Sequence, residues 1–154
     1  MNKKFMLRAI ELSKESVKNG GGPFGAVIVK DGEIIAESAN SVTKDNDPTA
    51  HAEVNTIRLA CKNLNTFVLS GCEIYSSCEP CPMCLGAIYW ARLDKLYFGN
   101  NKFDARDIGF DDSFIYDEIE LPAEKRKLQT INVMRDEALQ AFQNWKDFDE
   151  KTEY

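Results

Sequence analysis

The chain has 154 residues, the length of one domain of ordinary size. Hydrophobic residues make up 44% of it and charged residues 29%, which excludes a disordered or fibrous protein. The net charge is −6, and residues 101–154 carry all of it, with 14 acidic and 8 basic side chains. This balance argues mildly against a nucleic-acid partner, because proteins that bind phosphates normally present a basic face.

The N-terminal part of the chain predicts a helix followed by a β-hairpin. Residues 5–18 place apolar side chains at helical spacing, and a glycine-rich segment ends this helix. Two β-rich runs follow, at 24–30 and 33–40. The pair Asp31-Gly32 joins them, and an Asp-Gly pair between apolar runs is a strong hairpin signal.

The middle of the chain alternates helices with strands. Residues 41–48 are polar and predict a loop, and a helix follows from residue 49 or 50 to about 63. A strand is predicted at 72–77, an apolar helix at 82–91 with proline in its first turn, and a strand at 95–98.

Beyond residue 100 the pattern is weaker. Residues 129–134 predict a fifth strand, residues 136–150 an amphipathic helix, and residues 151–154 a tail. Strands and helices that alternate after a hairpin indicate the α/β class, here a three-layer α-β-α domain with a central mixed five-stranded sheet. We expect one domain over residues 1–154, in which about 120–154 form a C-terminal segment.

The cysteines and the single histidine indicate where the chemistry lies. Their number is odd and three of them fall within seven residues, which in a reducing compartment indicates a metal or catalytic cluster rather than disulfides. Any chemistry that needs imidazole must use His51. The cysteines are Cys61, Cys72, Cys78, Cys81 and Cys84.

His51 and the pair Cys81 and Cys84 each stand at the start of a predicted helix. A spacing of three places the two sulfurs on one face of a helical turn, so both can reach one ion. Helix N-termini also favour the thiolate form of cysteine. Three protein ligands leave the fourth tetrahedral position of Zn²⁺ open for water, as in catalytic zinc sites.

Glu53 follows the histidine by two residues, in the same predicted turn. From there its carboxylate can lie beside a water molecule whose pKa zinc lowers toward neutrality. A carboxylate in that position can take a proton from water and return it to a leaving group. We therefore predict that Glu53 acts as general base and then as general acid.

Simpler interpretations of the cluster stay open. A C-x-x-C pair is often a redox pair or part of a structural zinc site, for which Cys78 is the candidate fourth ligand. Neither alternative gives Glu53 a function, and Cys78 is also placed to end the strand at 72–77. We expect Cys61 and Cys72 to be small core residues.

Two motifs, His51-Ala52-Glu53 and Pro80-Cys81-x-x-Cys84, resemble the zinc deaminases of the cytidine deaminase-like superfamily. The predicted hairpin, with its run at 22–27 and Asn40, is similar as well. Within the superfamily the chain looks most like the small bacterial guanine deaminases. The runs that carry this likeness are residues 47–53, 78–84, 87–92 and 109–116 and the final Glu153-Tyr154.

The resemblance implies hydrolysis of guanine to xanthine and ammonia, with one zinc ion per subunit held by His51, Cys81 and Cys84 and with Glu53 moving protons. It also implies a homodimer in which the C-terminal segment is exchanged between subunits and helps close the active site. The substrate-side residues that it suggests are Phe24, Asn40, Ala52, Trp90, Asp112 and Tyr154.

Four of these residues also have ordinary structural explanations. Phe24 and Trp90 would otherwise be core side chains, and Asn40 a turn-capping amide. Tyr154 would otherwise belong to a solvated, frayed terminus.

Three other functions stay open. A tRNA adenosine deaminase shares the zinc chemistry, but the acidic C-terminal third argues against an RNA substrate. A cytosine deaminase would differ only in its pocket. A structural-zinc module that binds a protein partner would be no enzyme and would need neither Glu53 nor an exchangeable water.

Membrane and secretion signals are not found in the sequence. No apolar run approaches the ~18 residues of a membrane span. The basic residues near the N-terminus are not followed by the apolar block of a signal peptide. We therefore expect a cytoplasmic protein without a membrane partner, and the resemblance implies that its partner is a small purine base.

Overall fold

The computed structural model describes residues 2–154, so Met1, the first residue of the predicted domain, lies outside it. The chain forms two compact units, one that reaches to Asp112 and one that comprises Ser113–Tyr154. The boundary falls a few residues before the start predicted for the C-terminal segment. The two units are described separately below.

The first unit is built on a mixed sheet of four strands in the order β2-β1-β3-β4. β1 pairs antiparallel with β2 and with β3, whereas β3 and β4 are parallel. The prediction of a fifth strand at 129–134 is wrong: these residues have no strand structure, since they pair with no other strand of residues 2–154. The strands are β1 (Gly25–Lys30), β2 (Glu33–Ala39), β3 (Cys72–Cys78) and β4 (Lys95–Asn100).

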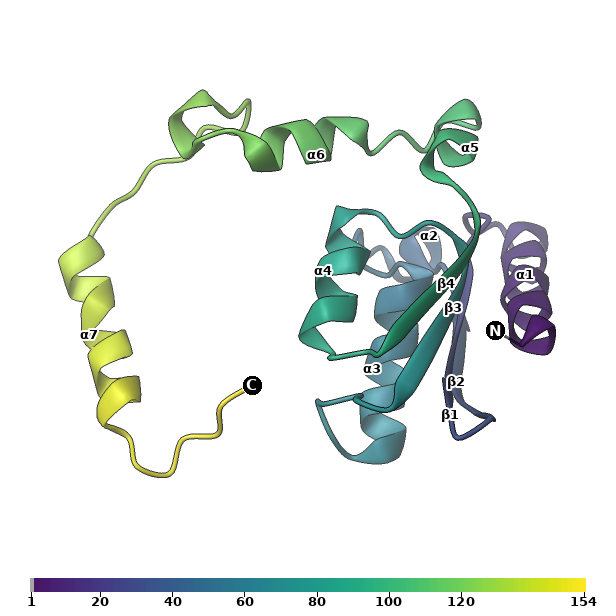
Figure 1. The fold of residues 1–154 in the computed structure, drawn as a ribbon. Helices are drawn as coiled ribbons and strands as arrows, with labels where there is room; N and C mark the ends of the chain where they lie inside the picture. The colour runs from purple at the N-terminus through teal and green to yellow at the C-terminus, as the bar shows by residue number, and fades with distance from the viewer. Residues whose placement is uncertain (1) are drawn as a thin grey trace. The chain divides into compact units, whose positions relative to one another are not determined.

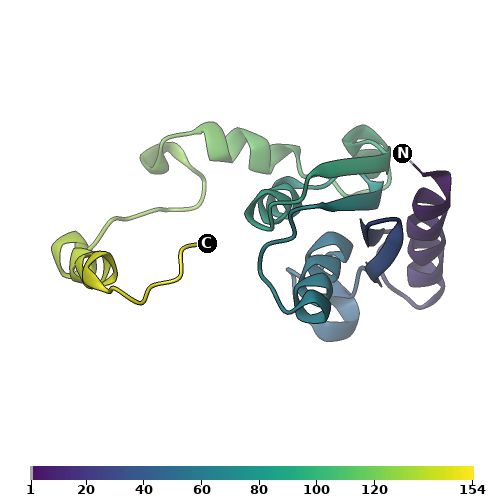
Figure 2. The same cartoon turned by 60° about the horizontal axis from the view of Figure 1, so that its bottom comes forward.

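Helices cover both faces of this sheet, which confirms the α-β-α layering (Figures 1 and 2). α1 (Lys3–Lys18) lies on one face, and α3 (Ala52–Leu64) and α4 (Pro82–Trp90) lie on the other. Alternate residues of β1 serve the two sides: Val27 packs toward α1, and Ile28 toward α3. The N-termini of α3 and α4 are thereby held beside each other on one side of the sheet.

Most of the element boundaries predicted from short sequence motifs agree with the structure to within a few residues. The hairpin turn has positive φ at Asp31 (52°) and Gly32 (82°), as a two-residue hairpin loop requires. The loop predicted at 41–48 is wrong in part, because α2 (Val42–Asp45) forms one turn of helix there. A further short helix that the sequence did not predict, α5 (Lys102–Asp107), follows β4.

The second unit consists of α6 (Ser113–Glu120), a 3₁₀ turn η1 (Ala123–Lys125) and α7 (Arg135–Asp147). α7 confirms the helix predicted at 136–150, although it ends three residues earlier. None of these three elements has a buried residue. The unit therefore has no hydrophobic core of its own.

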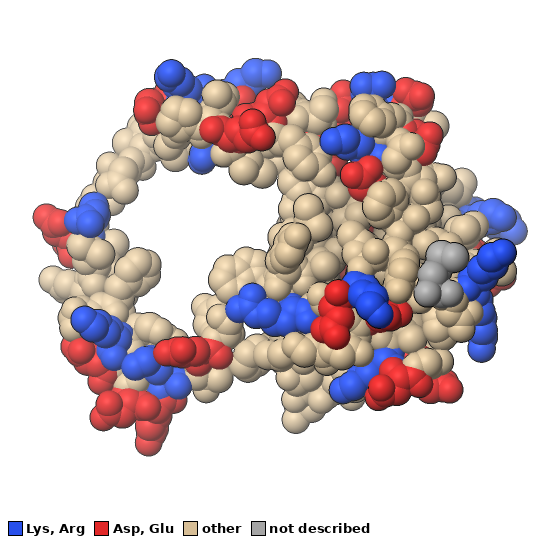
Figure 3. Space-filling view, in the orientation of Figure 1, with Lys and Arg blue, Asp and Glu red and all other residues tan. Residues whose placement is uncertain are grey.

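Charged side chains of both signs are interspersed on the face drawn in Figure 3. Within residues 2–154, no helix has the length and apolar character needed to cross a bilayer.

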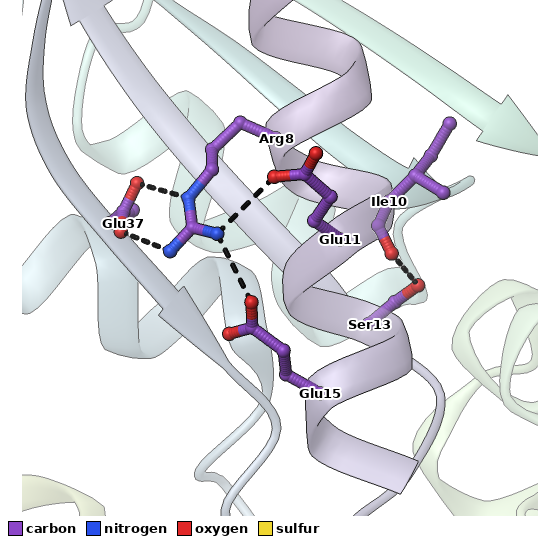
Figure 4. A network of polar contacts seen from close by, with 6 residues as sticks. All are labelled: Arg8, Ile10, Glu11, Ser13, Glu15 and Glu37. Carbon is purple, nitrogen blue, oxygen red and sulfur yellow. Dashed lines mark hydrogen bonds and ion pairs between the residues drawn. The ribbon is translucent and has the colours of Figure 1, made fainter. Parts of the chain in front are cut away.

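Arg8 ties α1 to the sheet through a network of carboxylates (Figure 4). Its Nε and Nη2 donate to the two carboxylate oxygens of Glu37 on β2, at 2.9 and 2.7 Å. Its Nη1 donates to Glu11 and Glu15 on the helix itself, at 3.4 and 3.3 Å. The hydrogen bonds from Arg8 hold the pKa of Glu37 below its usual range.

We expect Arg8→Met to lower the free energy of unfolding by about 1 kcal/mol at neutral pH, since a partly exposed ion pair is worth up to about that amount. Because the pKa of Glu37 is lowered in the folded state, its contribution is complete above the ordinary glutamate pKa of about 4.3 and is lost as pH falls through the lowered value. Urea unfolding at pH 7 and at pH 3 measures both effects.

The control for Arg8→Met is Lys14→Met, which removes a positive charge from an exposed position of the same helix. Equal destabilisation by the two variants at pH 7 would contradict a specific contribution from the Arg8 network.

Candidate active site

The residues predicted to bind metal stand at the starts of two neighbouring helices. His51 is the N-cap of α3 and Cys81 is the N-cap of α4, each with extended backbone angles. Pro82 occupies the first turn of α4, where its missing N–H costs no hydrogen bond. Cys84 lies three residues after Cys81 and is fully buried. The sequence prediction that both motifs open helices is confirmed.

The three side chains come together as a group that fits zinc. Their ligand atoms lie within 4.8 Å of one another. His51 Nδ1 is 3.6 Å from the sulfur of Cys81 and 3.4 Å from the sulfur of Cys84. Ligands at ~2.0 Å (nitrogen) and ~2.3 Å (sulfur) from one tetrahedral zinc ion stand about 3.5 Å apart, so spacing and donor types agree with zinc.

The electrostatics of the group favour a thiolate at Cys81, while the hydrogen bond to Cys81 raises the pKa of Cys84 and keeps it the thiol. Hydrogen bonds from Cys84 and from His51 lower the pKa of Cys81 to about 4. The same contact with Cys81 raises the pKa of His51. A thiolate next to an imidazole is the form in which these side chains bind a cation.

Glu53 lies in the first turn of α3 with only 5% of its surface exposed. Its Oε1 accepts a hydrogen bond from the hydroxyl of Ser76 at 3.0 Å, and its Oε2 is 3.5 Å from the Cys84 sulfur. Burial raises the pKa of Glu53. A carboxyl group whose pKa moves toward neutrality can both accept and donate a proton.

A cavity of about 850 Å³ lies beside these residues. All of its lining residues belong to the first unit, and they include His51, Glu53 and Cys81. Three of the predicted substrate-side residues also line it: Phe24, Asn40 and Asp112. Burial raises the pKa of Asp112, with a further contribution from the negative charge of Cys81.

Phe110 is a cavity residue that the sequence reasoning missed. Its ring meets that of Phe24 edge to face, with 5.0 Å between the centroids. Gly109 (φ +95°) turns the chain after α5 and directs it back toward the cavity. The place of Phe110 in the run Gly109-Phe110-Asp111-Asp112, which resembles the guanine deaminases, could have identified it as a cavity residue. Glu79 and Lys102 also line the cavity without having been predicted.

Asn40 lines the cavity and also caps the turn beside it. Its Oδ1 accepts hydrogen bonds from the backbone N–H groups of Gly22 (3.4 Å) and Val42 (3.3 Å), which is the capping role. With Oδ1 engaged, the amide group offers the cavity its NH₂ donor.

Three predicted substrate-side residues do not line the cavity. The side chain of Ala52 is fully buried in the core, so only its backbone N–H, at the start of a helix, could serve a ligand. Trp90 is 64% exposed at the end of α4, with the guanidinium of Arg92 5.8 Å from its ring centre. It is therefore not the core residue that was the alternative prediction. Tyr154 belongs to the second unit.

The remaining cysteines do not extend the metal group within the described residues. Cys78, the candidate fourth ligand of a structural zinc site, lies outside the group, and its thiol donates to the carbonyl of Asn101 at 3.8 Å. Burial raises the pKa of Cys78 to about 11, which favours the thiol. Cys72 is fully buried, and Cys61 packs against the core, as predicted.

Comparison with known proteins agrees with this geometry. Residues 1–100 match the cytidine and deoxycytidylate deaminase zinc-binding region, and the chain belongs to this family of zinc-dependent deaminases. Over 151 residues, 97% of both chains, it is 57% identical to the guanine deaminase of Bacillus subtilis strain 168. The X-ray structure of guanine deaminase from Bacillus subtilis has a TM-score of 0.97 and 56% identity, and the match covers 100% of this chain and 99% of that one.

Similarity to RNA-modifying relatives is shorter. The chain is 46% identical to the tRNA-specific adenosine deaminase of Aquifex aeolicus over 99 residues, which are 64% of this chain and 66% of that protein.

Proposed function

We propose that the protein hydrolyses free guanine to xanthine and ammonia. The observation that carries this proposal is the grouping of His51, Cys81 and Cys84 with the buried carboxyl of Glu53, beside a cavity walled by the ring of Phe24. Guanine as the base is supported by similarity to a guanine deaminase over 97% of the chain.

His51, Cys81 and Cys84 would hold the zinc ion, which supplies Lewis-acid activation of a water molecule when bound. Glu53 accepts the proton that the attacking water loses and donates it to the ring nitrogen next to the aminated carbon. A second proton, from the hydroxyl just added, passes through the same carboxylate to the amine. The carbon–nitrogen bond then breaks, so one water is consumed and one ammonia is released.

The cavity residues suit a flat heterocycle. The ring of Phe24 offers a stacking face, and the NH₂ group of Asn40 offers a donor to an acceptor on the base. Asp112, with its raised pKa, can share a proton with a ring nitrogen or an amine. The backbone N–H of Ala52 would add a contact near the metal group. We assign Trp90 no direct contact, since it lies outside the cavity lining.

Phe110→Ala is expected to raise KM for guanine about fivefold, because an edge-to-face aromatic pair is worth roughly 1 kcal/mol and Phe110 holds the ring of Phe24. Steady-state kinetics measure this change. The matched control is Phe103→Ala, which removes an exposed ring from α5 outside the cavity lining. If both variants keep the wild-type KM, Phe110 has no part in holding the base.

A tRNA adenosine deaminase is the second candidate, since it shares the zinc chemistry. Basic and acidic side chains are interspersed on the face in Figure 3, and residues 101–154 are acidic, which disfavours a polynucleotide. Ammonia release from guanine, adenine, cytosine, cytidine and a tRNA anticodon stem-loop separates the candidates. We expect guanine to be the best substrate. Turnover of the stem-loop without turnover of guanine would overturn the proposal, and cytosine as best substrate would redirect it.

We propose further that the protein is a homodimer in which the C-terminal segment, about residues 120–154, is exchanged between subunits. The support is that α6, η1 and α7 bury no side chain, while large apolar residues along them are exposed. An amphipathic helix of this kind needs a partner surface. The exposed residues include Phe114 and Ile119 on α6 and Leu139, Phe142 and Trp145 on α7.

The exchange predicts that two inactive variants restore activity together. One variant is full-length with Glu53→Gln, and the other keeps Glu53 but lacks residues 151–154, including Tyr154. In a mixed dimer the first variant supplies the tail that the second one needs. Co-expression in equal amounts is expected to give about a quarter of wild-type activity, since half of the dimers are mixed and each has one complete site.

Dimers with no activity after co-expression would contradict the exchange. Full activity of the truncated protein on its own would contradict the role of the tail, including that of Tyr154.

We propose a cytoplasmic location. All five cysteines are unpaired, which suits a reducing compartment.

A further inference from the structure

Ser76, on the central strand β3, contacts Glu53, the residue proposed to transfer protons. It lies on β3, opposite Ala26 of β1 and Phe98 of β4, and it is 1% exposed. Its hydroxyl donates to Oε1 of Glu53 at 3.0 Å. A serine in the centre of a buried strand thus uses its one polar group on a catalytic carboxylate.

The alternation along β3 makes this contact specific to one side of the sheet. Ile74 packs on the side of α3, while Tyr75 packs on the side of α1. By the same period of two, Ser76 faces α3. Its neighbour Ser77 uses its hydroxyl differently, to accept a hydrogen bond from the backbone N–H of Gly25 at 3.0 Å.

The two oxygens of Glu53 have different neighbours. Oε1 accepts a hydrogen bond from the hydroxyl of Ser76, and Oε2 lies 3.5 Å from the sulfur of Cys84. The thiol of Cys84 is a weak donor and the hydroxyl of Ser76 a stronger one, so the 3.0 Å hydrogen bond from Ser76 is the stronger of the two side-chain contacts that hold this carboxylate.

We infer that Ser76 is a positioning residue: its hydroxyl holds Oε1 of Glu53 so that Oε2 stays directed toward the group of His51, Cys81 and Cys84. This inference rests on the role of Glu53 in the proposed function. A carboxylate that moves protons must stay within hydrogen-bond reach of the reacting atoms. Losing its anchor lowers the fraction of molecules in the reactive geometry without removing the metal or the base-binding wall.

Ser76→Ala is expected to lower kcat about 10–100-fold, the range typical of residues that orient a metal-site group. KM for guanine, the affinity for xanthine measured by calorimetry, and the zinc content are expected to stay within twofold of wild type. Ser76→Thr keeps the hydroxyl on a residue that suits a strand and is expected to recover most of kcat.

Ser77→Ala is the matched control on the adjacent position. It leaves the N–H of Gly25 without its acceptor, so the protein unfolds at lower urea concentration, but kcat stays at the wild-type value. In the background of Glu53→Gln, Ser76→Ala is expected to cause no further loss of activity. A kcat for Ser76→Ala within twofold of wild type, or an equal loss in the Glu53→Gln background, would overturn the inference.

Urea unfolding of wild type, Ser76→Ala, Glu53→Ala and the variant with both substitutions tests the contact without any activity measurement, because alanine at position 53 removes the acceptor that glutamine would keep. We expect the effects of the two substitutions to be non-additive, because the residues are hydrogen-bonded. Additive effects would overturn the inference even if the substrate were another base. Absence of guanine turnover by the wild-type protein would instead contradict the proposed function.

Discussion

Glu53→Gln is expected to lower guanine turnover by several orders of magnitude while the fold and the zinc site are kept. Glutamine has nearly the same shape, and its carbonyl can still accept the hydrogen bond from Ser76. It cannot take up or release a proton at neutral pH, so the rate is expected to fall by at least about 10²–10⁴-fold. Ammonia release by the purified variant, with zinc content measured on the same sample, tests this result.

The matched control is Glu73→Gln, a carboxylate on the same strand as Ser76 that pairs with Lys95 at the surface. It is expected to keep wild-type activity. If Glu53→Gln stays within a few-fold of wild type, Glu53 is not the residue that moves protons.

Cys84→Ala is expected to remove zinc and activity together. It deletes one of the three ligand atoms that lie within 4.8 Å of one another. Four ligands of a protein zinc site share roughly 10–16 kcal/mol, so loss of one weakens binding by about 100-fold or more. Elemental analysis should give one zinc ion per subunit for the wild type and little for the variant, and a chelator should stop wild-type turnover.

Two further cysteine variants separate a catalytic site from a structural one. Cys61→Ala changes a thiol at the edge of the core and is expected to keep zinc. Cys78→Ala is also expected to keep zinc, because the thiol of Cys78 donates a hydrogen bond to the carbonyl of Asn101 and is not part of the metal group. Loss of zinc from Cys78→Ala would indicate four protein ligands and would contradict a catalytic zinc site.

The parts of the site that could be predicted from sequence are those set by local signals. A C-x-x-C pair at a helix start fixes the direction of both sulfurs, and an Asp-Gly pair fixes the hairpin that carries Asn40. His51 and Glu53 could be predicted for the same reason, because the backbone of one helical turn sets the relative positions of their side chains. Each of these features depends on a few neighbouring residues.

The features that could not be predicted depend on contacts between distant segments. Residues 129–134 have the β-branched side chains of a strand, but a strand needs a partner, and none pairs with them in residues 2–154. The turn at Gly109 places Phe110 in the cavity lining, against Phe24. Trp90 is exposed although the helix that carries it is apolar. The hydrogen bond from Ser76 to Glu53 joins residues 23 positions apart.

The most direct test of the proposed chemistry is the product formed from guanine in water enriched in ¹⁸O. Mass spectrometry of the base, together with an ammonia assay, follows both halves of the reaction. We expect xanthine that carries one ¹⁸O atom, formed in equal amount with ammonia and with the guanine consumed. Guanine recovered unchanged from the zinc-loaded protein, or xanthine without ¹⁸O, would contradict hydrolytic deamination of guanine at this site.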